Sequence, residues 1–328
     1  MIQLLTYHDI DQQQWQQLVQ SSPLATWFQT DEAYCFYQSV CDMRAFAYGV
    51  AEAGGLVGVV VGYTTREKCK FKQYFTARTI IPGGPLLATE ITNKALSTLL
   101  TALHERLDST IYIESRNYND YSQWKSVFTQ CGFTYNRHLD IHVHCNADHQ
   151  MSERRQRELK RAIKNGATVA EAQTEQEVRD WYQILNRLYR EKVRTPLFSE
   201  EFFLQFYRNG VGKYLLVKAD DKVIGGMMCP ILDGKAIYEW YVCGLDEEYR
   251  ELSPSVVATA AAINYAKVHG LPLFDFMGAG QPDVPYGVRD FKLEFGGELV
   301  EYGRFLCIRK PLLYWLGNLG VKFVKMKR

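Results

Sequence analysis

Alternating and continuous apolar segments recur in the same order in the two halves of this 328-residue chain. In the first half, strand patterns over Ala45–Val50 and Leu56–Tyr63 flank a Gly-Gly turn. In the second half, strand patterns over Tyr214–Ala219 and Val223–Ile231 flank an Asp-Asp turn. Each half therefore begins with a predicted β-hairpin.

A helix and a strand follow each hairpin. The helix predicted over Asn93–Leu107 precedes a strand over Thr110–Ser115, and the helix predicted over Pro254–His269 precedes a strand over Leu273–Met277. The shared order predicts a duplicated α/β unit.

The two halves also end alike, with a short aromatic-containing helix, a glycine turn and a last strand. Trp124–Phe133 can be laid over Val288–Gly297, and the last strands are Asp140–His144 and Tyr302–Ile308. The fold class we predict is α/β (α+β), with two tandem domains that each hold a mostly antiparallel, mixed sheet flanked by helices. The polar segment 146–166 is the predicted bridge between them.

The composition is that of an ordinary globular protein, with 47% hydrophobic and 23% charged residues and a net charge of +1. The near-neutral charge argues against a DNA-binding protein. The N-terminus lacks the basic and apolar regions of a signal peptide, and the apolar runs are too short for a membrane span. These features predict a cytoplasmic protein.

Several familiar motifs are absent or incomplete. The sequence contains no phosphate-binding P-loop and no G-x-S-x-G nucleophile turn. Gly278-Ala279-Gly280 follows a strand like a dinucleotide-binding motif, but Pro282 and Pro285 prevent the helix that should begin there. Asp140, His142 and His144 alternate along a strand, which permits a metal site, but we favour a solvent-facing strand surface and predict no metal.

The start of the helix after strand Ala236–Cys243 is a candidate binding site. Ser253 is a suitable N-cap, Pro254 suits the first turn, and Arg250 and Ser255 lie close by in sequence. A carboxylate, phosphate or pyrophosphate can bind the free N–H groups of such a terminus. A plain capped core helix is the alternative.

The strongest signal is a set of elements in the second half: Leu273–Gly278, Gly287-Val288, and Phe291–Gly297, which reads Phe-Lys-x-x-Phe-Gly-Gly. This set resembles the Fem family (FemA, FemB and FemX type), whose members transfer amino acids from aminoacyl-tRNA onto peptidoglycan precursors. The resemblance is strongest over about residues 152–303.

The resemblance implies two tandem GNAT-like acyltransferase domains. We expect these at residues 1–150 and 151–310, with the active cleft in the second, and a basic amphipathic tail at 311–328. It also implies an acyl or aminoacyl transfer onto an amine of a cell-envelope (peptidoglycan) precursor. That chemistry requires no cofactor, and the donor is either aminoacyl-tRNA or acyl-CoA.

Attack of an amine on an acyl group creates an oxyanion, which a cation or N–H donors must stabilise. We expect Lys292 to supply the cation, because the overlay places apolar Phe128 at the equivalent position of the first half. Asp275 is the second expected catalytic residue. The alternatives are a surface lysine at 292 and an ion pair between Asp275 and Arg289.

Other side chains of the second half are expected to bind the substrate. Tyr238 and Trp240 alternate on one predicted strand and should share a face, although core packing is the common fate of such residues. The expected substrate-binding residues are Phe291, Tyr238, Trp240, Tyr241, Arg250, Ser253, Ser255, Tyr189 and Arg289.

Two alternatives to the Fem-type reaction remain open. One is an acyl-CoA-dependent N-acyltransferase of the same fold acting on a sugar amine or small molecule. Enzymes of that kind usually carry an Arg/Gln-x-x-Gly-x-Gly/Ala loop, whereas the loop over Tyr249–Ser255 has no glycine. The other is a non-catalytic member that binds envelope precursors or RNA.

Two basic segments suggest partners. The helix pattern over Arg154–Lys164 can contact tRNA phosphates or a substrate diphosphate, or be a solvated face. The tail over 311–328 is basic, apolar and contains Trp315, which suits peripheral contact with the inner face of a membrane and a lipid-linked or nucleotide-linked precursor. A helix that packs back on its domain is the alternative.

Overall fold

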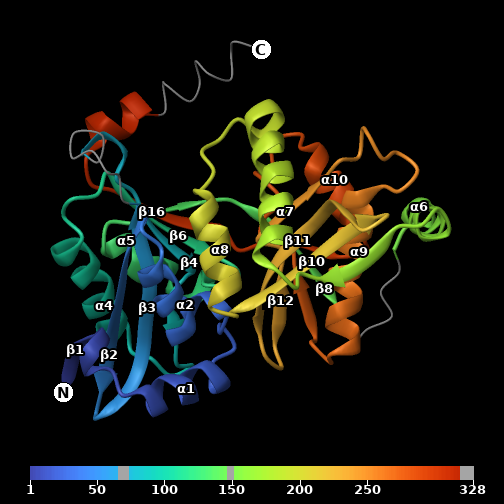
Figure 1. Cartoon of the computed structure of the whole chain (residues 1–328). Coiled ribbons are helices and arrows are strands. Elements are labelled where there is room, and N and C mark those ends of the chain that lie inside the picture. The colour runs from blue at the N-terminus through green and yellow to red at the C-terminus, as the bar shows by residue number, and fades with distance from the viewer. Residues whose placement is uncertain (66–73, 146–150, 318–328) are drawn as a thin grey trace. The chain divides into compact units, whose positions relative to one another are not determined.

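The computed structural model describes residues 1–65, 74–145 and 151–317 (Figure 1). The chain divides into two compact units. The first unit comprises Met1–Arg137 together with the segment from Tyr302 onward, and the second unit comprises His138–Glu301.

An eight-stranded sheet, counted over the described residues, forms the centre of the first unit, in the order β1-β2-β3-β4-β6-β16-β7 with β5 paired to β3. Its strands are β1 (Ile2–Thr6), β2 (Met43–Glu52), β3 (Gly55–Thr65), β4 (Thr79–Gly83), β5 (Leu86–Leu87), β6 (Tyr112–Asn117), β7 (Thr134–Asn136) and β16 (Arg304–Ile308). Its helices include α1 (Gln12–Ser21), α2 (Asp31–Ser39), α4 (Asn93–Arg106) and α5 (Lys125–Gln130).

The second unit has a matching sheet in the order β15-β8-β14-β12-β11-β10-β9, with β13 paired to β11. Its strands are β8 (Leu139–His144), β9 (Thr168–Glu171), β10 (Gly212–Ala219), β11 (Lys222–Leu232), β12 (Ala236–Tyr238), β13 (Tyr241–Gly244), β14 (Leu273–Asp275) and β15 (Glu298–Glu301). Its helices include α6 (Glu153–Lys164), α7 (Glu175–Leu188), α8 (Glu200–Arg208), α9 (Pro254–Val268) and α10 (Gly287–Leu293).

The two sheets confirm the predicted duplication and its mixed, mostly antiparallel character. The hairpins β2–β3 and β10–β11 are antiparallel, whereas β4–β6 and β12–β14 are parallel. Reading β9 to β15 against β1 to β7 gives the same strand order in both sheets. The duplicated pattern in the sequence therefore corresponds to a duplicated topology.

The last strands are exchanged between the halves, so their pairing differs from the predicted one. β8, predicted to close the first half, lies between β14 and β15 in the second unit. β16, predicted to close the second half, lies between β6 and β7 in the first unit. The division therefore falls near residues 137 and 301, and differs from the predicted boundaries at 150 and 310.

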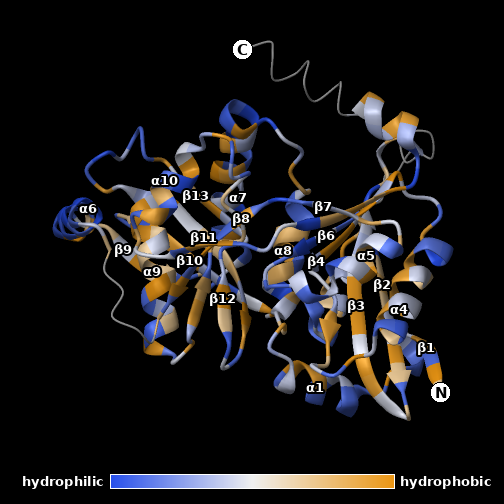
Figure 2. Cartoon of the chain, turned by 180° about the vertical axis from the view of Figure 1, so that it is seen from behind, coloured by the Kyte–Doolittle hydropathy of each residue, from blue (hydrophilic) through white to orange (hydrophobic). Residues whose placement is uncertain are grey.

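Apolar burial explains how α9 is held in the second unit. Val256, Val257, Ala260 and Ile263 are all buried, because the helix contacts β10, β11, β13 and α6. A helix that is apolar round most of its circumference must be enclosed in this way. In Figure 2 orange, hydrophobic segments recur along the strands, whereas α6 is drawn mostly in the blue of hydrophilic residues.

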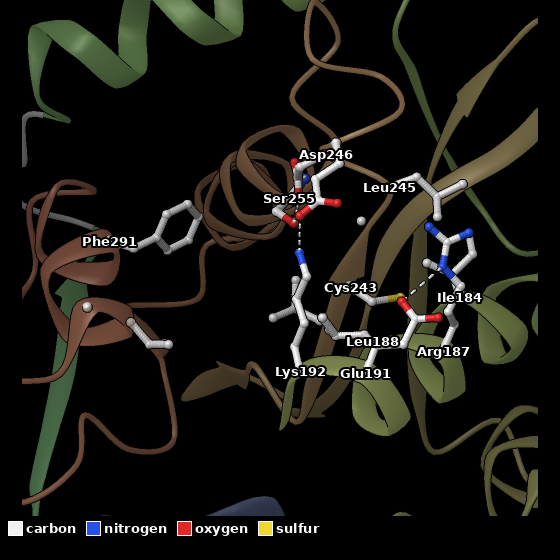
Figure 3. A pocket seen from close by; sticks show the side chains of 15 residues that line it. Ile184, Arg187, Leu188, Glu191, Lys192, Cys243, Leu245, Asp246, Ser255 and Phe291 are labelled. Carbon is white, nitrogen blue, oxygen red and sulfur yellow. Dashed lines mark hydrogen bonds and ion pairs between the residues drawn. The ribbon is translucent and has the colours of Figure 1, made fainter. Parts of the chain in front are cut away.

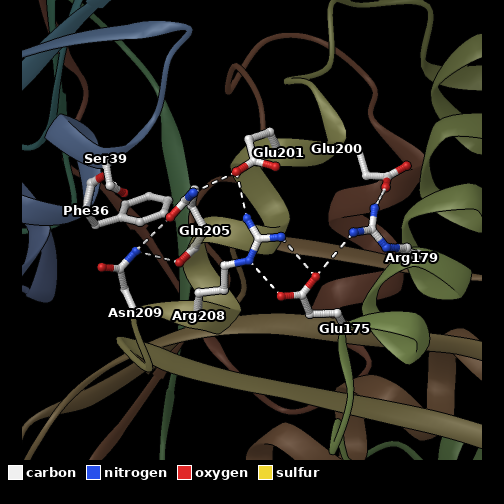
Figure 4. A network of polar contacts seen from close by, with 9 residues as sticks. All are labelled: Phe36, Ser39, Glu175, Arg179, Glu200, Glu201, Gln205, Arg208 and Asn209. Carbon is white, nitrogen blue, oxygen red and sulfur yellow. Dashed lines mark hydrogen bonds and ion pairs between the residues drawn. The ribbon is translucent and has the colours of Figure 1, made fainter.

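A network of ion pairs joins α7 to α8 (Figure 4). Arg208 of α8 contacts Glu175 at 2.7 Å and Glu201 at 2.8 Å, and Arg179 of α7 contacts Glu175 and Glu200. The hydrogen bond that Arg208 donates lowers the pKa of the Glu175 carboxyl. The network fixes the first turns of α7, whose other end reaches the pocket described below.

The described segments contain no helix with the length and apolar character needed to cross a membrane. Residues 311–317 form a short helix in the first unit, and Leu312, Trp315 and Leu316 are exposed on it. The rest of the predicted tail, 318–328, lies outside the described residues.

Candidate active site

A pocket of about 390 Å³ opens in the second unit where β13 ends and α9 begins (Figure 3). The end of α7, the end of β13, the β13–α9 loop and the start of α10 line it. Two of the predicted substrate-binding residues, Ser255 and Phe291, are in its wall.

The pocket lies where the sheet splits. The single strand predicted over Ala236–Cys243 is two strands, β12 and β13, interrupted at Glu239–Trp240. β12 pairs in parallel with β14, whereas β13 pairs only with β11 within the described chain. One edge of β13 is thus open toward the pocket, and its backbone groups can bind a ligand.

The interruption also changes the predicted alternation of aromatic residues. From Ile231 to Met228, β11 advances three residues, while its partner advances four, from Ile237 to Tyr241. This extra residue is a bulge, so the rule that put Tyr238 and Trp240 on one face does not hold across it.

The start of α9 is capped differently from the prediction. Pro254 occupies the first turn as expected, but Ser253 has a left-handed backbone (φ 39°), and its hydroxyl donates to the Arg250 carbonyl instead of capping the helix. The Asp246 carboxylate accepts the backbone N–H of Ser255 at 3.0 Å and also bonds the Ser255 hydroxyl. An acid from the preceding loop, not Ser253, therefore caps α9.

Gly244 allows this close approach of strand, loop and helix. A Cβ atom at residue 244 would lie 2.7 Å from Ser255 Oγ and 2.8 Å from Ser255 N. Real Cβ atoms do not come so close, so a larger residue would push the helix start away from β13.

The charged residues at the pocket are paired with one another. Lys192 contacts Glu247 at 2.6 Å, and Arg187 contacts Glu248 as well as Glu191, the latter at 3.6 Å. Glu191, which lies in the helical turn Tyr189–Val193 after α7, and Glu247 and Glu248 of the β13–α9 loop therefore neutralise these two cations.

Lys292 is buried rather than on the surface, with 8% of its area exposed. Its ammonium donates to the carbonyls of Phe276 at 2.8 Å and Gly278 at 2.9 Å, and lies 3.0 Å from the Glu239 carboxylate. Three acceptors match the three N–H bonds of a lysine. The surface-lysine alternative is wrong: Lys292 ties α10 to the loop after β14 and to the bulge.

Asp275 is buried beside a histidine rather than paired to Arg289. Its carboxylate accepts the Met277 N–H at 2.6 Å and lies 3.5 Å from His142 Nε2. Arg289 instead donates to the carbonyls of Gln281 at 2.8 Å and Val284 at 2.7 Å. The predicted Asp275–Arg289 ion pair is not formed.

Asp140 and His142 on β8 are buried next to Asp275, so the predicted solvent-facing surface is wrong for both. Burial and the Asp275 charge raise the pKa of Asp140 to about 8. Burial opposes the charge of His142, but the Asp275 carboxylate outweighs it and raises the pKa of that histidine. Donor atoms of the three residues lie within 4.8 Å, a spacing that can hold a metal ion. His144 alone is exposed, beside Glu298.

The predicted aromatic residues pack mainly against α8. The Trp240 ring lies 5.2 Å from that of Phe202, and the Tyr241 ring lies 5.1 Å from that of Phe203. The ring centroids of Tyr189 and Tyr241 lie 6.2 Å apart. Burial raises the pKa of the Tyr189 hydroxyl to about 12. Tyr238 is buried. None of these four predicted residues lines the pocket, so the structure does not bring them to it as predicted.

Two further basic predictions can be placed. Arg250 is exposed on the β13–α9 loop. On α6, Arg155 is buried over the Phe291 ring at 4.4 Å and pairs with Glu294, while Arg154 and Arg161 contact Glu158 and Glu251. α6 is therefore partly neutralised and helps to position α10, and Lys160 and Lys164 stay exposed on it.

Comparison with known proteins is consistent with this geometry. A family model described as an acetyltransferase (GNAT) domain matches residues 152–292. FemX has a similar structure, with a TM-score of 0.71 and 14% identity over 96% of this chain and 99% of that chain. A comparison with curated proteins finds no match.

Two other solved structures have the same two-unit fold. One is the C-terminal domain of a putative lysylphosphatidylglycerol synthetase from Agrobacterium fabrum, with a TM-score of 0.60 and 12% identity over 94% of this chain and 95% of that one. The other is a tandem GNAT protein from the clavulanic acid biosynthesis pathway, with a TM-score of 0.59 and 11% identity over 94% and 99%.

Residues 152–292 of the second unit match a GNAT acetyltransferase domain, and the chain is an acyltransferase enzyme. The chain as a whole has the fold of FemX, so the fold that the Fem resemblance implied is confirmed. The non-catalytic alternative is set aside, because the match to a GNAT acetyltransferase domain supports an enzyme.

Two residues around the site, Asp246 and Glu239, were not predicted, and His142 was predicted to face solvent. Asp246 lies in an acidic run, Asp246-Glu247-Glu248, which contains none of the glycines typical of a phosphate-binding loop. Glu239 lies in the break between β12 and β13, His142 lies on β8, and their partners Lys292 and Asp275 come from distant parts of the chain. The one signal in the sequence for Glu239 is an acid within an otherwise apolar and aromatic stretch, 236–243.

Proposed function

We propose that this acyltransferase is a Fem-type aminoacyltransferase that moves an aminoacyl or acyl group onto an amine of a cell-envelope (peptidoglycan) precursor. The observation that carries the proposal is the pocket at the split of the second sheet. It joins an open strand edge, a helix start and Phe291 of the Phe-Lys-x-x-Phe-Gly-Gly element.

The chemistry needs donors for the oxyanion and an acceptor for the amine proton. The open edge of β13 offers backbone N–H groups that can donate to the oxyanion. Glu191 and Glu247 line the pocket, and their carboxylates can accept the amine proton. Lys292 has its three N–H bonds engaged. We therefore assign it to holding the cleft in shape, and keep direct contact with the oxyanion as a second role to test.

The donor under this proposal is an aminoacyl-tRNA. Lys160 and Lys164 are exposed on α6 and can contact its phosphates. An acyl-CoA-dependent N-acyltransferase acting on a sugar amine or small molecule is the second candidate, and the absence of glycine from Tyr249–Ser255 counts against it.

The acceptor side involves a precursor that is lipid-linked or nucleotide-linked. The exposed Leu312, Trp315 and Leu316, next to Arg309 and Lys310, support peripheral contact with the inner face of a membrane. Such contact would bring the enzyme to a lipid-linked acceptor.

Calorimetry with charged tRNA, uncharged tRNA and acetyl-CoA tests the proposal. We expect saturable binding of charged tRNA, weaker binding of uncharged tRNA, and little binding of acetyl-CoA. Saturable binding of acetyl-CoA with none of charged tRNA would replace the proposal with the CoA-dependent candidate.

A further inference from the structure

The start of α9 carries a carboxylate where a free helix terminus would accept an anion. Helix N-termini bind phosphates through unsatisfied N–H groups. Here Pro254 has no N–H, and the N–H of Ser255 is already donated to Asp246 at 3.0 Å. The Ser255 hydroxyl is bound to the same carboxylate.

The basic side chains around the pocket are also bound to carboxylates of this loop. Lys192 pairs with Glu247 and Arg187 with Glu248, and both acids directly follow Asp246 in the loop. Of three consecutive acids, the first thus caps the helix and the other two form ion pairs with Lys192 and Arg187. A pyrophosphate entering this pocket would meet negative charge and no unpaired partner among these groups.

We propose that Asp246 is a specificity-determining residue that takes the place of a ligand phosphate at α9 and excludes acyl donors that carry a pyrophosphate, such as acyl-CoA. This inference deepens the proposed function, on which it rests, by assigning the choice of donor to one side chain. A carboxylate that repels the competing ligand is an established way to obtain specificity.

The same carboxylates suit the other class of donor. An aminoacyl ester carries an α-ammonium group beside its reactive carbonyl, and this cation is attracted to the acids that repel a phosphate. Asp246, Glu247 and Glu191 all line the pocket. The loop therefore selects for one donor class and against the other.

The test is calorimetry of CoA and of inorganic pyrophosphate with the full-length protein and three variants. Asp246→Ala removes both the charge and the cap, and Asp246→Asn removes the charge but keeps an acceptor for Ser255. Asp221→Asn removes one exposed carboxylate in the β10–β11 turn, outside the pocket, and is the matched control.

We expect Asp246→Ala to bind CoA at least about tenfold more tightly than the unaltered protein, Asp246→Asn to gain about threefold, and Asp221→Asn to gain nothing. Equal affinity in the unaltered protein and Asp246→Ala, or an equal gain in Asp221→Asn, would overturn the inference. If Asp246→Ala does not fold, the gain of Asp246→Asn over Asp221→Asn decides.

These readouts need no transfer activity. Failure to bind charged tRNA would count against the proposed function and leave the CoA result standing. Unchanged CoA affinity in both Asp246 variants would count against the inference alone.

Discussion

Helices α4 and α9 occupy the same place in the two sheets but begin in different ways. In the first unit, the neighbouring Thr92 side chain accepts the Ala95 N–H at 3.2 Å and caps α4. In the second unit, the cap of α9 comes from Asp246, nine residues before Ser255. The residue next to α4 in sequence caps that helix, whereas an acid from the loop that lines the pocket caps α9.

The short helices α5 and α10 differ in the same direction. Phe128 of α5 stacks on Phe305 of β16 at 3.9 Å, whereas its counterpart Lys292 binds two carbonyls and Glu239. The first unit closes this position with an aromatic pair, and the second uses it to hold a polar cleft. The two units share one strand order and differ at these positions.

The largest expected effect comes from breaking the lysine contact. Lys292→Met leaves Glu239 buried without its cation and should lower the unfolding free energy by about 3–5 kcal/mol. Adding Glu239→Gln should recover most of that loss, as measured by urea denaturation. Transfer activity in the stable double variant then separates the two roles: recovered activity means that Lys292 only holds the cleft, and lost activity means that it also acts on the substrate.

The matching change in the first unit is Phe128→Ala. Loss of the stacked ring should lower the unfolding free energy by about 3–5 kcal/mol. Because the pocket belongs to the second unit, kcat per folded molecule should stay within about twofold of normal. A fall in kcat larger than the unfolded fraction explains would contradict a single working site.

Gly244→Ala tests the close approach at the pocket. The new methyl group would meet Ser255, and overpacking of this kind costs about 1–3 kcal/mol. Gly55→Ala in the first unit is the control, because its Cβ would lie 3.8 Å from the nearest atom. Equal urea midpoints for the two variants would show that α9 can move away from β13 without cost.

The buried cluster of Asp140, His142 and Asp275 should make the unfolding free energy of the second unit fall as the pH rises. Burial and Asp275 raise the pKa of Asp140 to about 8, so the folded state holds a proton that the unfolded state releases near pH 4. The stability that this proton contributes is present below about pH 4 and is lost as the pH rises through about 8. Asp140→Asn should flatten the decline in unfolding free energy between those values. An unchanged slope would contradict the assignment.

The smallest effect on stability is expected at the 311–317 helix. Replacing the exposed Leu312, Trp315 and Leu316 with serine should change the unfolding free energy by less than about 0.5 kcal/mol. The same variant should sediment less with anionic vesicles than the unaltered protein, with neutral vesicles as the control. Equal sedimentation would remove the membrane-surface proposal.

Much of the frame could be predicted because it depends on local pattern. The hairpins, α4 and α9 appear within a few residues of their predicted bounds, since turn residues and apolar periodicity mark them. The strand exchange could not be predicted, because β8 and β16 are both short strands, at least half apolar, and nothing local to either names its pairing partner. Sequence order favoured the wrong pairing.

The site was harder to predict for a related reason. Pro254, Ser255 and Phe291 were found from local signals and do line or adjoin the pocket. The partners of Lys292 and Asp275 could not be found in this way. Glu239 lies 53 positions from Lys292 in the sequence, and His142 lies 133 positions from Asp275. Tertiary contacts of that range leave no local pattern.

The position of β16 has a consequence for how the chain folds during synthesis. β16 fills an inner place between β6 and β7, so the first sheet is incomplete until residue 308 has left the ribosome. All residues of the second unit are made before that strand and can fold earlier. The half of the protein that is translated first is therefore the half that is completed last.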